Sequence, residues 1–79
     1  MSQFISDIKY LRQQAPATFT ILSLLRQGYK HPQIIKMLDI PSWKFTRTLR
    51  SSCDRYNCAS YYQLICDAAE AGVFKELEI

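Results

Sequence analysis

The stretch 42–56 carries cations, hydroxyl groups and an aromatic ring at spacings that suit contact with duplex DNA. On a helix that advances about 100° per residue, the apolar side consists of Phe45, Leu49, Ser52, Cys53 and Tyr56. The other side and its flanks consist of Trp43, Lys44, Thr46, Arg47, Arg50, Ser51 and Asp54. The Asp54 carboxylate would repel phosphate, so we expect it to lie beyond the groove or to pair with Arg50 or Arg55. Guanidinium groups match guanine edges, and lysine and hydroxyl groups match phosphate oxygens. We therefore expect this helix to read bases with four side chains: Trp43, Lys44, Arg47 and Arg50.

This face also has a simpler interpretation, because many basic helix faces are only solvated surface. Trp43 can stack on a sugar or a thymine methyl, or it can cover the turn before the helix, which is slightly favoured. The distribution of charge along the chain supports the interpretation that this face contacts DNA. From Arg26 to Tyr56 there are seven Lys or Arg and two Asp, a net charge of +5, whereas 67–79 has four acidic residues and one lysine, a net charge of −3. One side of the molecule is therefore expected to face phosphates.

The residues before this helix predict a shorter helix and a tight turn. Ile34, Ile35 and Leu38 fall on one face of a helix that begins near Pro32, and 39–41 form the turn. So short a turn holds two helices at a steep angle, which lets one enter a groove while the other braces it. We expect a helix-turn-helix over about 31–50, with double-stranded DNA as its partner.

Polar side chains in or beside this motif are candidates for phosphate contacts. They are Lys30, His31, Gln33, Thr46 and Ser51. His31 would donate from the N-terminus of the shorter helix, where backbone N–H groups also favour an anion. As the single histidine of the chain, it is better explained as a helix cap or a surface residue.

The residues ahead of the motif predict two further helices. Over 2–13 an apolar stripe recurs at helical spacing, and it consists of Phe4, Ile5, Ile8 and Leu11. The next helix begins at Pro16, whose missing N–H donor costs nothing in a first turn, and it ends near Gly28. We expect 1–14 to be an N-terminal helical extension and 15–79 to form one domain.

The last helix has a capping-box pattern at its start. Ser60 is the expected cap, Gln63 is expected to reach back to it, and the helix ends at Gly72. No segment alternates long enough to predict a strand. The expected fold class is therefore all-α, a small bundle of four to five helices that contains the helix-turn-helix.

The composition excludes several classes of protein. With 79 residues, 48% of them hydrophobic, the chain is expected to form one small domain with its own core. No apolar run approaches the roughly 18 residues needed to span a bilayer, and the first residues are too polar for a signal peptide. We expect a cytoplasmic protein without membrane contact.

The three cysteines, Cys53, Cys58 and Cys66, are expected to act as small buried apolar residues. They cannot all pair within the chain, which favours a reducing compartment. Their spacing matches no common zinc motif, and only one histidine is present. The sequence also lacks a nucleophile motif and a phosphate-binding glycine loop. We expect no metal, no cofactor and no enzyme activity.

From Pro16 to about Phe74 the chain resembles the DNA-binding domain of the LuxR-type regulators, which is also found in NarL-type response regulators and stand-alone GerE-like proteins. The matching segments are 21–28 (ILSLLRQG, similar to the family's VLRLLAQG), 33–34 (in place of EI), 38–40 (in place of LGI) and 71–74 (similar to GLI). Lys44 stands where the family usually has threonine, and Thr46 where it has lysine. The resemblance implies a helix-turn-helix whose second helix enters the major groove.

The resemblance also implies that two copies pair through the last helix, whose outward residues are Tyr62, Cys66 and Ala69. A merely exposed helix face explains these three residues equally well. The expected function is that of a small DNA-binding transcriptional regulator, either a homodimer or a heterodimer with another regulator. The alternative is a protein-interaction module that pairs with another LuxR-type regulator and modulates it.

Overall fold

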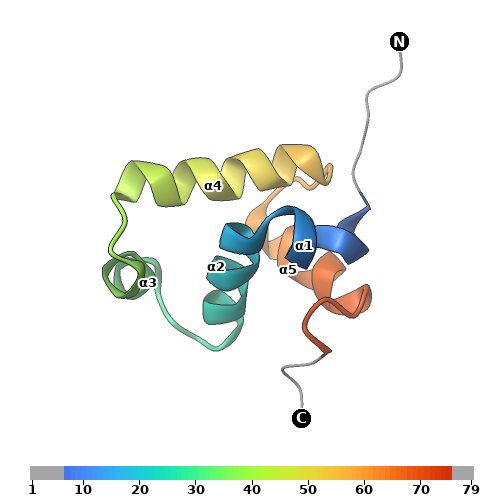
Figure 1. Cartoon of the computed structure of the whole chain (residues 1–79), viewed down its shortest axis with the longest axis horizontal. Coiled ribbons are helices and arrows are strands. Elements are labelled where there is room, and N and C mark those ends of the chain that lie inside the picture. Colours follow the sequence, from blue (N-terminus) through green and yellow to red (C-terminus); the bar gives the residue numbers. More distant parts are fainter. Residues whose placement is uncertain (1–6, 76–79) are drawn as a thin grey trace.

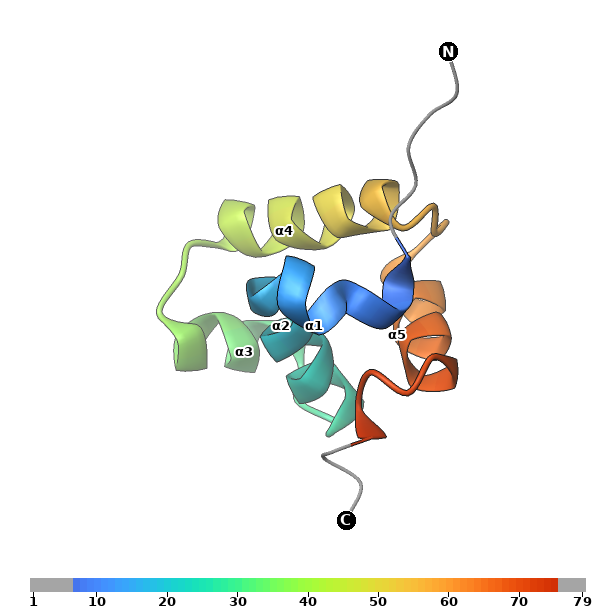
Figure 2. The same ribbon diagram turned by 45° about the vertical axis from the view of Figure 1, so that its right-hand side comes forward.

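The computed structural model describes residues 7–75, and this part of the chain is all-α, as the sequence predicts. Its elements are the 3-10 helix η1 (Ile8–Tyr10), α1 (Leu11–Gln14), α2 (Pro16–Arg26), α3 (His31–Leu38), α4 (Ser42–Arg55) and α5 (Tyr61–Glu70). In Figures 1 and 2, α4 runs along one side of the molecule, α2 lies beneath it, and α5 lies at the far end from α3. No helix within 7–75 is both long and apolar enough to cross a bilayer.

The N-terminal extension differs from the single helix expected over 2–13. Phe4 and Ile5 lie outside the described residues. After them the chain forms the short 3-10 helix η1, whose Asp7 side chain accepts a hydrogen bond from the Lys9 amide at 3.1 Å, and only then the single-turn helix α1. The prediction that this helical segment ends before Pro16 is confirmed.

Within 7–75 four residues with left-handed backbone set helix ends, and the sequence predicts Gly28 and Gly72 among them. The other two are Asp39 (φ 53°) and Asn57 (φ 56°), which end α3 and α4. Asp and Asn tolerate this conformation better than most side chains. After Asn57 the amide of Cys58 donates to the Cys53 carbonyl at 2.8 Å, which closes the last turn of α4. The short turn predicted over 39–41 is therefore confirmed.

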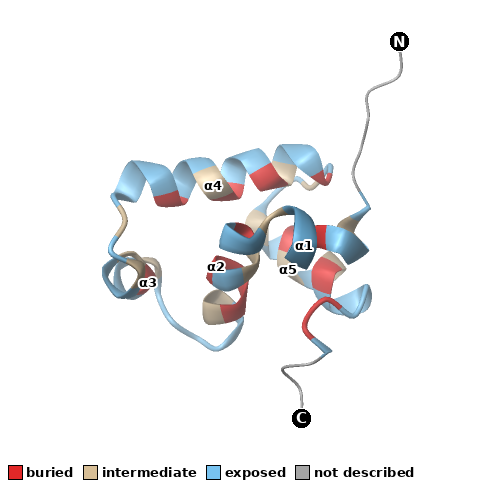
Figure 3. Ribbon diagram, viewed as in Figure 1, coloured by how far each residue is buried: buried red, intermediate tan, exposed pale blue. Residues whose placement is uncertain are grey.

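The core gathers residues from each of the helices α1 to α5, around α2. Its buried apolar members are Leu11, Ile21, Leu22, Ile34, Phe45, Leu49, Tyr56, Leu64, Ala68, Val73 and Phe74. Figure 3 shows that the buried positions of α4 lie on the side that faces α2, whereas its other side is exposed along its length. The apolar stripe predicted for α4 is thus the stripe that it buries.

The helices α3 and α4 are joined by three residues, 39–41. In Figure 1, α3 is seen nearly along its axis while α4 lies across the view. Ile34 of α3 and Phe45 of α4 both enter the core, which fixes the two helices relative to α2. The short connection expected between the two helices is therefore observed.

Candidate nucleic-acid interface

The outward side of α4 carries the four residues expected to read bases. Trp43 is 63% exposed, and Lys44, Arg47 and Arg50 are exposed as well, while Phe45 on the inward side is 2% exposed. Within residues 7–75 no hydrogen bond or ion pair engages these three cations. Because they lie at positions i, i+3 and i+6, they follow one side of the helix. We call Trp43, Lys44, Arg47 and Arg50 the basic face.

Two hydroxyl groups expected to contact phosphate flank this face, since Thr46 and Ser51 are both exposed. A shallow depression along α4 is lined by Ser42, Trp43, Thr46, Arg47 and Arg50. A second depression, between α4 and the start of α2, is lined in part by Trp43, Arg47 and Ser51. Trp43 and Arg47 border both depressions, and the Trp43 side chain is largely uncovered by the turn.

Contacts that the sequence did not reveal hold α4 in place. The buried hydroxyl groups of Thr18 on α2 and Ser52 on α4 share a short hydrogen bond. Near the other end of α4, the Tyr56 hydroxyl donates to Gln14 Oε1 at 2.9 Å, and Arg55 Nη1 donates to the Gln14 carbonyl at 3.2 Å. These bonds tie α4 to α1 and α2, so the basic face is presented on a helix with a fixed orientation.

The remaining candidates for phosphate contact lie at the start of α3, away from the outward side of α4. Lys30 is exposed and borders a groove that reaches α5. Gln33 acts as a cap, because its Oε1 accepts from the Lys30 amide at 2.8 Å. That bond uses only the amide oxygen, and a phosphate contact needs the amide N–H donors.

His31 is placed differently from the expectation of a solvent-facing phosphate donor. Its ring is half-buried, with its centroid 4.9 Å from the Phe45 ring and 5.2 Å from the Tyr61 ring. The imidazole therefore joins α3, α4 and α5 as a packed aromatic group. A lone histidine in a sequence gives no sign of the rings around it, so this packing was not predicted, and the phosphate contact of His31 stays a prediction.

The residues expected at a dimer interface are all on the outer side of α5. Tyr62 is 67% exposed, and Cys66 and Ala69 are exposed, whereas Leu64 and Ala68 face the core. The Tyr62 ring stacks on that of Tyr61 with centroids 4.2 Å apart. The structure thus brings the three residues to one open face.

The cap of α5 follows the predicted pattern with one difference. Ser60 Oγ accepts from the Gln63 amide at 3.4 Å, as expected. The Gln63 side chain reaches back one residue further than predicted, because its Oε1 accepts from the Ala59 amide at 2.9 Å. Two backbone donors at the start of α5 are satisfied in this way.

The thiols depart in part from the expectation that all three are buried. Cys66 is exposed, so the expectation is wrong there, while Cys53 and Cys58 are half-buried. Burial and the neighbouring Asp67 raise the pKa of Cys58 to about 11, and the thiol lies 3.6 Å from Asp67 Oδ2. Burial, with a smaller effect of Asp54, also raises the pKa of Cys53. Both thiols are therefore protonated at neutral pH and are weak nucleophiles.

Metal ligands are not gathered in the part of the chain that is described, where no three His, Cys, Asp or Glu side chains are close enough to hold an ion.

Searches against family models, curated proteins and solved structures gave no significant match to the chain. A proposal of function therefore rests on the arrangement of the basic face.

Proposed function

We propose that the chain is a small DNA-binding transcriptional regulator that reads duplex DNA by placing α4 in the major groove. The observation that carries the proposal is the basic face. Three cations and an indole line one exposed side of a helix, and within residues 7–75 no hydrogen bond or ion pair neutralises the cations. An excess of positive charge on a rigid surface favours a polyanionic partner.

The dimensions of α4 suit the groove. Its 14 residues make a rod about 21 Å long and about 10–12 Å wide, and the major groove of B-DNA is about 12 Å wide. Three of the four residues of the basic face, Trp43, Lys44 and Arg47, lie in the N-terminal half of α4, which is the part that recognition helices insert. The side chains of these three residues are exposed, which leaves this half open to a duplex.

Roles follow from the chemistry of each side chain. Arg47 and Arg50 present planar forks suited to the O6 and N7 atoms of guanine. Lys44 and Trp43 lie beside them, and the exposed indole is suited to stack on a sugar or on a thymine methyl. The phosphate contacts are assigned to Thr46 and Ser51 on α4 and to Lys30 and Gln33 at the start of α3.

The proposed assembly is a dimer through α5. The open face of Tyr62, Cys66 and Ala69 is apolar at its centre, and the resemblance of 16–74 to LuxR-type domains supports pairing through this helix. Either two copies of the chain or one copy and another regulator would place two α4 helices on one duplex, and such a regulator would act in the cytoplasm.

The test is a DNA-binding measurement at several salt concentrations. With roughly six phosphates neutralised per dimer, log affinity is expected to fall against log salt with a slope of about −5. The double variant Arg47→Ala/Arg50→Ala is expected to lose retention on DNA. The matched control Lys9→Ala/Lys75→Ala removes the same charge from exposed residues away from α4. A slope near zero, or equal loss in both variants, would refute the proposal.

A second candidate is a protein-interaction module that pairs with another LuxR-type regulator, and the exposed Tyr62 on α5 favours it. In that case Arg47→Ala/Arg50→Ala would leave biological activity and partner binding intact, while Tyr62→Ala would weaken both. Loss of activity together with loss of DNA retention in the arginine variant would favour the DNA-binding function.

A further inference from the structure

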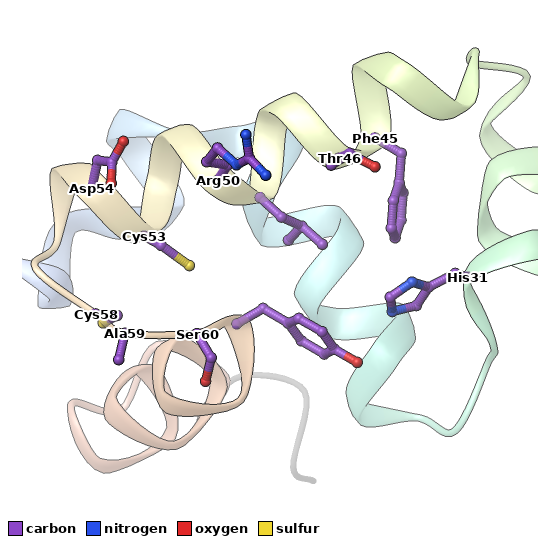
Figure 4. Close-up of a pocket in the computed structure, with 11 residues that line it drawn as sticks. His31, Phe45, Thr46, Arg50, Cys53, Asp54, Cys58, Ala59 and Ser60 are labelled. Carbon is purple, nitrogen blue, oxygen red and sulfur yellow. The ribbon is translucent and has the colours of Figure 1, made fainter.

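A cavity of about 370 Å³ opens between α4 and the N-termini of α3 and α5. Figure 4 shows it below α4, with His31 at one end and Cys58, Ala59 and Ser60 at the other. Ligand-binding pockets run from about 300 to 1,000 Å³, so this one is suited to a molecule about the size of an amino acid. The proposed DNA-binding function uses only Arg50 and Thr46 among its lining residues.

The wall of the cavity is apolar and well fixed. Phe45 and Leu49 belong to the core, and their inner surfaces line the space. Between α4 and α5 the sulfur of Cys53 points into the cavity (Figure 4). The rings of His31 and Tyr61, 5.2 Å apart, border the same space. An apolar side chain of moderate size would find contact on several sides.

The rim on α4 carries one cation and one anion, Arg50 and Asp54. They are one helical turn apart, about 6 Å along the axis, and no ion pair joins them in the part of the chain that is described. A simple carboxylic acid would bring its charge close to Asp54, and a simple amine would bring its charge close to Arg50. A zwitterion offers an opposite charge to each.

We propose that this cavity binds a free α-amino acid with an apolar side chain. The carboxylate pairs with Arg50, the ammonium group pairs with Asp54, and the side chain lies against Phe45, Leu49 and Cys53. Arg50 also belongs to the basic face, so a bound amino acid withdraws one base-reading cation from DNA. Only this last consequence rests on the proposed DNA-binding function.

The first experiment measures binding to the full chain by isothermal titration calorimetry without DNA. Leucine, phenylalanine and tryptophan are compared with 3-phenylpropionate, phenethylamine and glutamate. At least one of the first three is expected to bind, and each of the last three at least about tenfold more weakly. No binding of any apolar amino acid at about 10 mM, or equal affinity for 3-phenylpropionate and phenylalanine, would overturn the proposal.

Variants locate the site. Arg50→Gln and Asp54→Asn each remove one charge from an exposed position, and Cys53→Met fills the cavity. Each is expected to lower the affinity for the amino acid about tenfold or more. The control Lys36→Gln removes an exposed cation of α3 outside the cavity and is expected to leave affinity unchanged. Circular dichroism confirms that each variant is folded. Equal affinity in Arg50→Gln, Asp54→Asn and the native chain would overturn the assignment.

A second arm measures DNA affinity with and without saturating amino acid, and a fall of about tenfold is expected from the loss of one arginine contact. Unchanged DNA affinity would overturn the shared use of Arg50. If the chain binds no DNA at all, the proposed function has failed, and calorimetry still decides whether the cavity binds an amino acid.

Discussion

Two pairs of arginines lie in opposite surroundings in this molecule. Arg47 and Arg50 stand on the outward side of α4 and engage no hydrogen bond or ion pair within 7–75. Arg12 lies over the Phe19 ring at 5.0 Å, and Arg26 lies over the Phe74 ring at 4.9 Å. The two phenylalanine rings stack on each other with centroids 5.8 Å apart. We call Arg12, Phe19, Phe74 and Arg26 the aromatic stack.

The difference shows why the location of charge alone does not identify a binding surface. All four arginines are exposed and add equally to the net charge. In the aromatic stack the guanidinium groups cover rings that close the end of the core, which contributes to stability. On the basic face, no hydrogen bond or ion pair within 7–75 engages the cations, which leaves them available to a partner. The presence or absence of an internal partner separates the two roles.

The largest expected effect comes from removing the buried ring of the aromatic stack. Phe74 is 1% exposed, so Phe74→Ala is expected to lower the free energy of unfolding by about 3–5 kcal/mol. Trp43→Ala, which removes a larger ring that is 63% exposed, is expected to cost less than about 1 kcal/mol. Urea unfolding of both variants measures the comparison, with Phe74→Leu as a folded control. Equal losses would show that Trp43 is part of the core.

The second prediction concerns removal of each arginine pair in turn, with DNA affinity and the free energy of unfolding as the two measurements. Arg47→Ala/Arg50→Ala is expected to weaken DNA binding by about 1–3 kcal/mol per arginine and to change the free energy of unfolding by less than about 0.5 kcal/mol.

Arg12→Ala/Arg26→Ala removes the same charge and is expected to do the reverse. It should lower the free energy of unfolding by about 0.5–1 kcal/mol per arginine and leave DNA affinity nearly unchanged. Because net charge is equal in the two variants, titration of DNA and urea unfolding separate the contact from the overall field. If both variants lost DNA affinity and stability to the same extent, the two arginine pairs would not differ in role.

Much of the basic face was predictable because it depends on local spacing. Phe45 and Leu49 define the inward side of α4, and the side opposite them then follows from helix geometry. The helix ends were also predictable, since Gly28 and Gly72 occupy left-handed positions that suit this residue type. The all-α fold follows from the same periodicity.

Long-range contacts were not predictable, because nothing local distinguishes the residues that make them. Ser52 was assigned to the inward side of α4, but its partner Thr18 lies 34 residues away. Gln14 reaches the end of α4 across 42 residues. His31 was interpreted as a cap or surface group because the rings of Phe45 and Tyr61 meet it only in the folded chain. The roles of Arg12 and Arg26 stayed hidden for the same reason.

The third prediction concerns the bond that fixes α4 beneath the basic face. Thr18→Val or Ser52→Ala alone leaves one buried hydroxyl without its partner and is expected to cost about 1–3 kcal/mol. The double variant is expected to cost less than the sum of the two single losses, because no hydroxyl is then left unpaired. A double-mutant cycle by urea unfolding tests this. Simple additivity would mean that the two groups do not stabilise α4 through their bond.

The smallest expected effect comes from a comparison of two thiols, the half-buried Cys58, which contacts Asp67, and the exposed Cys66. The folded chain raises the pKa of Cys58 from 9.0 to about 11, chiefly through burial and then through Asp67. The folded state therefore keeps a proton that the unfolded state releases between pH 9 and 11. This contribution is fully present below about pH 9 and is lost as pH rises through about 11.

Cys58→Ser keeps a donor for Asp67 but does not titrate in this range, so its stability is expected to fall less between pH 8 and 11. The expected difference is about 1 kcal/mol, since solvent screens part of the effect at a half-buried site. Urea unfolding at both pH values measures it, and Cys66→Ser, at an exposed site of α5, serves as the control because its fall should match that of the native chain. An equal fall in stability between pH 8 and 11 for the native chain and both variants would show that Asp67 and burial do not hold the Cys58 proton in the folded state.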